Sequence, residues 1–99
     1  MNTVKNEEIL ELLKSLKDEA RQRYKAELKG VFGSYARGEE NEDSDVDVLV
    51  DFLDNATLFE LVGLGDFLEE KLNCKIDIVS QRAVREEIRP YIYRDLVYL

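Results

Sequence analysis

Residues 45–52 alternate between acidic and apolar side chains, and this alternation constrains the fold more than any other part of the sequence. Successive side chains of a β-strand point to opposite faces. If residues 45–52 form a strand, one of its faces is apolar and consists of Val46, Val48, Val50 and Phe52. The other face consists of Asp45, Asp47, Leu49 and Asp51. We therefore predict a strand that packs one face on the core and leaves the other open for polar chemistry.

Two more segments have the character of strands. Residues 28–32 form a short apolar stretch that ends at Gly33, where the chain is expected to turn sharply. Residues 75–79 alternate again, with Asp77 between two isoleucines. Between Gly33 and the acidic strand, residues 34–37 are expected to begin a short helix that Gly38 closes.

Longer helices are predicted before and after the acidic strand. Residues from about Val4 to Tyr24 repeat apolar side chains at a helical period: Ile9, Leu13, Leu16 and Ala20. Thr57 and Glu60 fit a capping box that opens a second helix, which runs to about Leu72. Its side chains expected to point mostly inward are Leu58, Leu61, Val62, Phe67, Leu68 and Leu72. Gly63 and Gly65 weaken a helix, so close packing is expected at both.

The last fifth of the chain is predicted to be helical and then aromatic. Residues 82–88 have a helical pattern that is interrupted or restarted at Pro90. The tail from Tyr91 to Leu99 combines three tyrosines with aliphatic residues: Tyr91, Ile92, Tyr93, Leu96, Val97 and Tyr98. Two interpretations stay open for this tail, a contact with a partner protein and packing of a last helix on the sheet.

Length and cysteine content limit the class of protein. A chain of 99 residues has room for one core, so residues 1–99 are expected to form a single domain. No segment reaches the roughly 20 apolar residues of a membrane span, and the N-terminus lacks the apolar region of a secretory signal. Cys74 is the only cysteine, which excludes an internal disulfide and favours a buried or half-buried thiol without a chemical role. A cytoplasmic location is expected.

The charge excludes other classes of function. The chain has 22 acidic and 14 basic residues and a net charge of −8. Binding to nucleic acid rests largely on Lys and Arg that neutralise phosphates, so no direct binding to nucleic acid is expected. The absence of histidine removes Ser-His-Asp and Cys-His catalysis and any metal site with a histidine ligand.

Three carboxylates are the candidate catalytic and metal-binding groups. Asp45 and Asp47 project to the same side, and two ionised carboxylates so close repel each other unless a cation lies between them. Oxygen ligands favour Mg²⁺, with Mn²⁺ as an alternative, over zinc. If the strand of Asp77 lies beside this one, three acids can hold two divalent ions that grip a triphosphate. Asp51 lies farther along and is interpreted as a surface acid.

The turn before the acidic strand is the candidate nucleotide-binding element. Gly33 and Ser34 follow a strand and open a helix, where free backbone amides and a hydroxyl can face a phosphate. Arg37 is a candidate for neutralising the β- or γ-phosphate. A surface arginine, or an ion pair with an acid of residues 39–43, is the alternative for Arg37.

These motifs resemble the nucleotidyltransferase superfamily that includes DNA polymerase β and the aminoglycoside nucleotidyltransferases. The resemblance is strongest to the minimal nucleotidyltransferase (MNT) domains. It rests on residues 31–38 and 44–50, with residues 57–64 and 75–79 resembling later segments. It implies an α/β (α+β) fold of the polymerase β type, with a small mixed sheet of about three or more strands flanked by helices.

The resemblance also implies roles and a partner. Asp45 and Asp47 would bind Mg²⁺, Asp77 would activate the acceptor hydroxyl, and Gly33 and Ser34 would hold the phosphates of ATP. The usual partner of such proteins is a HEPN-domain protein, often a ribonuclease toxin, in a hetero-oligomer. The MNT protein then acts as antitoxin, in some cases by transferring AMP from ATP to a tyrosine of the toxin.

Two other functions stay open at this point. One is an antitoxin that neutralises its partner by binding alone, although pure binding does not need three converging carboxylates. The other is transfer to a small molecule such as an aminoglycoside. Larger relatives carry a second domain for the acceptor, and here the core uses nearly all of the 99 residues. A separate protein is therefore expected to supply the acceptor and close the site against water.

Overall fold

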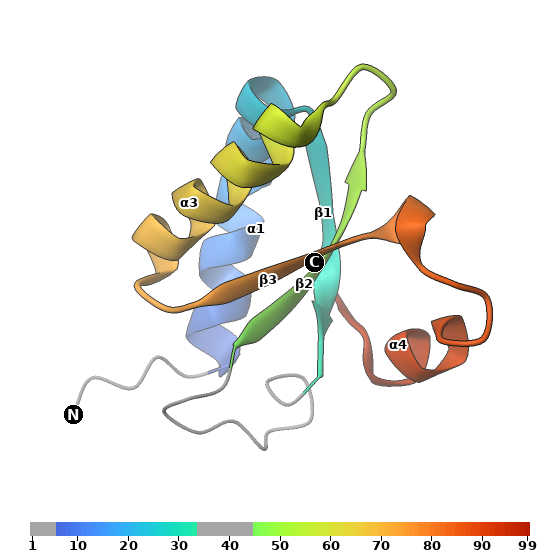
Figure 1. Ribbon diagram of the computed structural model, residues 1–99. Helices are drawn as coiled ribbons and strands as arrows, with labels where there is room; N and C mark the ends of the chain where they lie inside the picture. The colour runs from blue at the N-terminus through green and yellow to red at the C-terminus, as the bar shows by residue number, and fades with distance from the viewer. Residues whose placement is uncertain (1–5, 34–44) are drawn as a thin grey trace.

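The computed structural model describes residues 6–33 and 45–99 (Figure 1). Its elements are α1 (Asn6–Tyr24), β1 (Ala26–Phe32), β2 (Val46–Phe52), α3 (Leu58–Leu72), β3 (Ile76–Ser80), a 3₁₀ turn (Gln81–Ala83), α4 (Arg89–Asp95) and β4 (Val97–Tyr98). The short helix predicted from Ser34 to Arg37 and the start of the first helix at Val4 lie outside the described residues. Among the helices described, none is both long and apolar enough to cross a membrane.

The strands form one mixed sheet in the order β3-β2-β1-β4. β1 pairs antiparallel with β2 and with β4, whereas β2 and β3 are parallel. The three predicted strands are present, and the mixed sheet confirms the expected fold class. β4 was not predicted. It has two residues and pairs through Val97 with Val31 and through Tyr98 with Gly30, so it depends on the edge that β1 offers.

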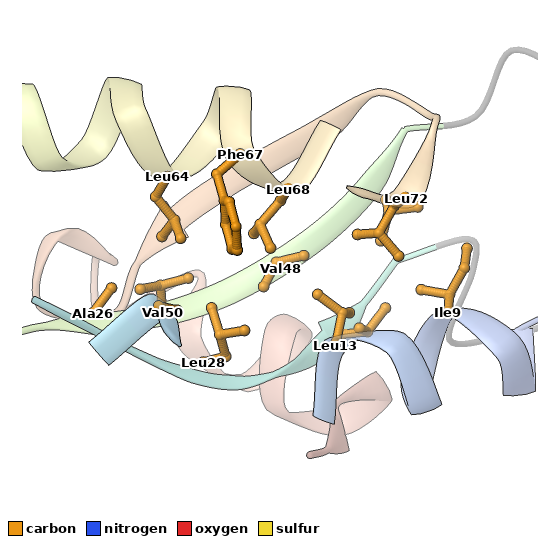
Figure 2. Close-up of a cluster of buried hydrophobic side chains, with 13 residues drawn as sticks. Ile9, Leu13, Ala26, Leu28, Val48, Val50, Leu64, Phe67, Leu68 and Leu72 are labelled. Atoms are coloured by element: carbon orange, nitrogen blue, oxygen red, sulfur yellow. The ribbon is translucent and has the colours of Figure 1, made fainter. Parts of the chain in front are cut away.

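The hydrophobic core lies between the sheet and two helices. α1 and α3 cover one face of the sheet, and α4 lies on the other side (Figure 1). Figure 2 shows apolar side chains of α1, β1, β2 and α3 meeting in this layer. Val46, Val48 and Val50 are completely buried there, as the alternation of residues 45–52 predicts. The predicted inward positions of α1 are also confirmed, since Ile9, Leu13 and Ala20 are buried and Leu16 packs against the cluster.

The predicted inward face of α3 is partly wrong. Leu58 and Val62 are 71% and 57% exposed, while Leu64, which was not among the expected positions, is completely buried. Leu64, Leu68 and Leu72 recur every four residues and form one stripe with Phe67. Only one such stripe can face the sheet. Val62 lies about 200° around the helix from Leu64 and therefore faces outward.

The helix predicted for residues 82–88 is also wrong. A 3₁₀ turn and a further turn occupy this segment, and the helix begins only at Arg89. The Arg82 guanidinium contacts the carboxylates of Asp51 at 3.0 Å and Asp54 at 2.8 Å, which ties the turn to the end of β2. Pro90 lies in the first turn of α4, where a missing N–H leaves no hydrogen bond unmade.

The capping box at the start of α3 is confirmed. The backbone N–H of Thr57 donates to Glu60 Oε1 at 2.6 Å, and the Phe59 N–H donates to Thr57 Oγ1 at 3.2 Å. The Thr57 hydroxyl also donates to Glu60 Oε1 at 2.7 Å. The bond from the Thr57 hydroxyl is the largest cause that lowers the pKa of Glu60, and the bond from the Thr57 backbone N–H is the next. The ionised form of Glu60 is therefore favoured in the folded protein.

The cap makes stability depend on pH. A carboxyl with a lowered pKa stabilises the fold above its unfolded pKa of about 4.3, and this contribution is lost as the pH falls through the folded pKa. The difference in free energy of unfolding between wild type and Glu60→Gln should therefore shrink as the pH falls from 6 to 3 in chemical denaturation. In a Thr57→Ala background the difference should depend less on pH. Equal pH dependence in both backgrounds would contradict this account of the cap.

Gly63 and Gly65 form a matched pair for testing the packing of α3. A Cβ at Gly63 would lie 2.8 Å from Cε1 of Tyr24, whereas a Cβ at Gly65 would meet Cδ1 of Ile78 at an ordinary 3.8 Å. The Tyr24 ring packs on Phe67 with the ring centroids 5.2 Å apart, so it cannot move away freely. Close packing is thus confirmed at Gly63 only.

Alanine should have opposite effects at these two glycines. Gly65→Ala should stabilise the protein by about 0.5–1 kcal/mol, because alanine favours the helix and meets no obstacle. Gly63→Ala should destabilise it by about 1 kcal/mol or more, because overpacking outweighs the gain in helix propensity. Urea denaturation measures both changes. Stabilisation by both substitutions would show that Tyr24 yields without cost.

Candidate active site on the open face of the sheet

The parallel pairing of β2 and β3 brings two of the predicted acids together. Asp47 and Asp77 are direct partners in the register, as Val46 with Ile76 and Val48 with Ile78 are on either side. Paired residues on neighbouring strands point to the same face and are separated by about 4.8 Å in backbone spacing. Asp45 precedes β2 by one residue and lies two residues before Asp47. The fold therefore gathers the three acids at one end of the sheet.

Burial of the intervening valines orients these acids. Val46 and Val48 are completely buried under α1 and α3, so Asp47 between them must point to the opposite face. The N–H of Val46 donates to the carbonyl of Lys75 at 2.9 Å, which joins the start of β2 to the segment before β3. Asp45 and Asp77 are exposed and Asp47 is half-buried. Asp47 and Asp77 are thus accessible to a ligand from the open face, and Asp45 is exposed at the start of β2.

Gly33 lies directly against Asp47. Its φ is +79°, in the left-handed region that favours glycine. A Cβ at this position would overlap the Oδ2 atom of Asp47 and lie 3.3 Å from its Cγ. The backbone can therefore turn beside the carboxylate only because residue 33 has no side chain. The other two candidates for phosphate binding, Ser34 and Arg37, lie outside the described residues.

Asp51 shares the face of Asp47 but is engaged elsewhere. Its carboxylate pairs with Arg82 at 3.0 Å, and Arg82 also pairs with Asp54 at 2.8 Å. Hydrogen bonds to Asp54 and to Asp51 raise the pKa of the Arg82 guanidinium. Asp51 was interpreted as a surface acid, and in the structure its partly exposed carboxylate is paired with Arg82. Sequence reasoning missed its partner, because Arg82 is 31 residues away along the chain.

The surroundings of Cys74 disfavour a reactive thiolate. The residue is half-buried, and burial, followed by the negative charges of Glu69 and Asp45, raises the pKa of its thiol. A raised pKa keeps the sulfur protonated, whereas nucleophilic or metal-binding cysteines need the thiolate. The expectation of a thiol without a chemical role therefore agrees with its surroundings.

The donor chemistry of the three acids fits a hard divalent cation, although their side chains are not gathered around one point. Within residues 6–33 and 45–99, no three Asp, Glu, His or Cys side chains converge closely enough to hold a metal ion. Asp45 and Asp77 are exposed, so rotation of their side chains meets little obstruction. Carboxylate oxygens are the preferred ligands of Mg²⁺. The backbone positions fit a shared ion, and the side chains require rotation to reach it.

An apolar groove beside the acids was not predicted. It is lined by side chains of β1, β3, the segment that leads into α4 and α4 itself, among them Phe32, Val79, Val84, Ile88 and Ile92. Val79 lies two residues beyond Asp77 on β3 and so shares its face. That Asp77 and Val79 share one face of a strand could have been predicted from the sequence. The contribution of residues 84–92 could not, because it depends on how this segment packs against the sheet.

Comparison with known proteins identifies close relatives. Residues 13–98 match the family described as nucleotidyltransferase domain. The chain is 41% identical over 93 residues to the protein adenylyltransferase MntA of Thermococcus cleftensis, covering 94% of each chain. A solved structure provisionally described as a minimal nucleotidyltransferase is 38% identical, with a TM-score of 0.74, and the match covers 91% of this chain and 95% of that one.

A more distant structure shares the fold. It is a crystal structure of a toxin-antitoxin with AMP-PNP, 22% identical with a TM-score of 0.68. The match covers 99% of the present chain and 72% of the other. At this level of identity the likeness is one of fold alone.

The contact between Gly33 and Asp47 can be tested by a double-mutant cycle. Gly33→Ala should destabilise the protein by about 1–2 kcal/mol from the left-handed backbone alone, with an added cost from the overlap with Asp47. In an Asp47→Ala background the added cost should disappear and the backbone cost should stay. Urea denaturation of the four proteins gives the coupling free energy. A coupling of zero would mean that the carboxylate does not lie against residue 33.

Proposed function

The chain belongs to the nucleotidyltransferase domain family, and we propose that it transfers AMP from ATP to a hydroxyl group of a partner protein. That it is a nucleotidyltransferase follows from the family and from its adenylyltransferase relatives. The proposal for the acceptor is supported by the adenylyltransferase of Thermococcus cleftensis, whose name specifies a protein acceptor. The observation that carries the proposal is the register of β2 and β3, which places Asp47 beside Asp77.

The proposed reaction is an in-line displacement at the α-phosphorus of ATP. The acceptor oxygen forms a bond to this phosphorus, the bond to the β-phosphate oxygen breaks, and pyrophosphate leaves. Asp77 accepts the proton of the acceptor hydroxyl, as an exposed carboxylate on the face of Asp47 can. Gly33 and Ser34, with Arg37 as a further cationic contact, hold the triphosphate. Positioning and charge stabilisation then supply most of the catalysis.

Mg²⁺, or Mn²⁺ in its place, is the proposed cofactor, and Asp45, Asp47 and Asp77 are the residues that would hold it. When bound, such an ion neutralises charge on the triphosphate and polarises the attacking oxygen. The exposed positions of Asp45 and Asp77 and the closeness of Asp77 to Asp47 in the sheet support this set of ligands. A cation would also relieve the repulsion between these carboxylates.

The proposed acceptor is a tyrosine of a HEPN-domain toxin, and the chain would act as the antitoxin in a cytoplasmic hetero-oligomer. Support comes from the fold that this chain shares with a toxin-antitoxin protein and from its likeness to an adenylyltransferase. The net charge of −8 also favours a basic protein partner over nucleic acid. The HEPN class and the tyrosine come from the family resemblance of the sequence.

The transfer can be tested by measuring the intact mass of the proposed HEPN-domain partner after co-expression with this chain. Wild type should add one or more AMP units to the partner, and Asp45→Ala/Asp47→Ala should add none, because two of the three proposed ligands of the cation are lost. Asp51→Ala is the matched control: it removes an acid from the same strand face, but one paired with Arg82, and transfer should persist. Circular dichroism of each variant checks that the fold is retained.

Other outcomes would favour the alternatives. Transfer at the wild-type rate by the double variant would refute the assignment of these carboxylates. An unmodified partner that both proteins still bind and neutralise would favour an antitoxin that works by binding alone. An adenylylated aminoglycoside in a reaction without partner protein would favour transfer to a small molecule.

A further inference from the structure

The apolar groove lies on the same face of the sheet as the proposed catalytic acids. Its volume is about 400 Å³, within the range of about 300–1,000 Å³ that is usual for ligand pockets. The apolar side chains that line it are Phe32, Val79, Ala83, Val84, Ile88 and Ile92. Ser80 and Arg85 are the only other residues of its lining among the described part of the chain. α4, which contributes Ile92, lies on the side of the sheet opposite to α1 and α3 (Figure 1).

The register of the sheet places this groove next to the carboxylates. Phe32 of β1 is the direct partner of Asp47 on β2, so both side chains point to the same face. Val79 is two residues beyond Asp77 on β3, a separation of about 6.6 Å along a strand. Asp47 therefore has an apolar wall of the groove on one side and Asp77 on the other. The groove and the two acids therefore lie on the same face of neighbouring strands.

The burial of its lining shows that the groove has a fixed floor and an open rim. Ile92 is 7% exposed, and Phe32 and Val79 are half-buried in the sheet. Ile88 is 47% exposed at the rim although it is fully apolar. Its exposed surface would gain from covering by an apolar ligand. The groove thus offers an apolar surface to a ligand, and two residues of its lining, Phe32 and Val79, lie next to the acids in the sheet.

The lining distinguishes between possible occupants. A nucleobase carries several donors and acceptors on its edges, which lose hydrogen bonds when they enter an apolar site. A serine or threonine side chain has a hydroxyl but no apolar body large enough to fill the groove. A phenol ring combines a large apolar body with one polar end. Among hydroxyl acceptors, this chemistry fits tyrosine.

We infer that the groove between Phe32, Val79 and Ile88 holds the aromatic ring of the acceptor tyrosine and directs its hydroxyl to Asp77. The inference rests on the proposed function, to which it adds a binding site for the acceptor side chain. In the transfer step the phenol oxygen bonds to the α-phosphorus, its proton passes to Asp77 and pyrophosphate leaves. The nucleobase of ATP then lies outside this groove.

Binding of a tyrosine analogue tests the inference without requiring transfer. The ¹⁵N-labelled protein is titrated with 4-methylphenol and, separately, with adenosine, both to millimolar concentration, and amide chemical shifts are followed by NMR. We expect 4-methylphenol to shift the amides of Phe32, Val79, Val84 and Ile88 and adenosine to leave them unchanged. Shifts of these amides by adenosine, or no shifts by 4-methylphenol, would overturn the inference.

Two variants and a matched control localise the binding. Ile88→Ala removes part of the rim and should raise the dissociation constant of 4-methylphenol at least fivefold. Ala83→Trp fills the groove from an exposed position and should abolish the shifts. Val62→Ala is the control, because it truncates a similarly exposed aliphatic side chain on α3, outside the groove, and should change nothing. Equal binding by all four proteins would overturn the inference.

A transfer assay separates this inference from the proposed function. With the partner protein, ATP and Mg²⁺, Ala83→Trp should lower kcat/KM for the partner at least tenfold while the Kd of AMP-PNP stays unchanged. A weaker Kd of AMP-PNP with unchanged kcat/KM would assign the groove to the nucleotide and overturn the inference. Absence of transfer by wild type would refute the proposed function, and the titration with 4-methylphenol would still decide whether the groove binds a phenol.

Discussion

The parallel pairing of β2 with β3 is the interaction on which the rest of this structure depends. It places Asp47 beside Asp77, and it does so against the repulsion of two carboxylates. That repulsion is about 1 kcal/mol for charges 4 Å apart in water, and the exposure of Asp77 keeps the surroundings close to water. Burial of Val46, Val48 and Val50 on the other face contributes about 1.5–3 kcal/mol for each side chain. The core therefore determines the face on which Asp47 lies, and the pairing with β3 places Asp77 beside it.

As a result, the two faces of the sheet differ in how far helices cover them. α1 and α3 close one face with a continuous apolar layer that includes Leu64, Leu68 and Leu72. α4 covers only part of the other face, so the acids stay accessible and an apolar groove is left beside them (Figure 1). Charge and apolar surface lie side by side on this second face. This combination suits a reaction in which a triphosphate and an aromatic acceptor meet.

Predictions from the sequence were correct where the pattern lies within one element, and wrong or missing where the outcome depends on contacts between elements. The alternation of residues 45–52 and the capping box of Thr57 and Glu60 depend on spacing within one element, and both are present. The apolar character of Leu58 and Val62 predicts that they face the core, but the stripe that includes Leu64 and Leu68 packs against the sheet instead. β4 and the turn held by Arg82 depend on β1 and on Asp51, which lie far away in the chain.

The sequence by itself determined which side chains of β2 face the core between the sheet and the helices, because the period of a strand leaves no other choice once its valines enter that core. It did not determine that Leu49, on the face of Asp47, is buried as well. It also supplied the prediction for the chemistry of the candidate site, since carboxylates and a glycine turn favour a hard cation and a phosphate. Only the tertiary structure decided that Asp77 lies beside Asp47 and that Phe32 and Ile88 border the same groove. These contacts join strands and turns distant in sequence, and the packing of the whole sheet selects among the registers that each segment allows alone.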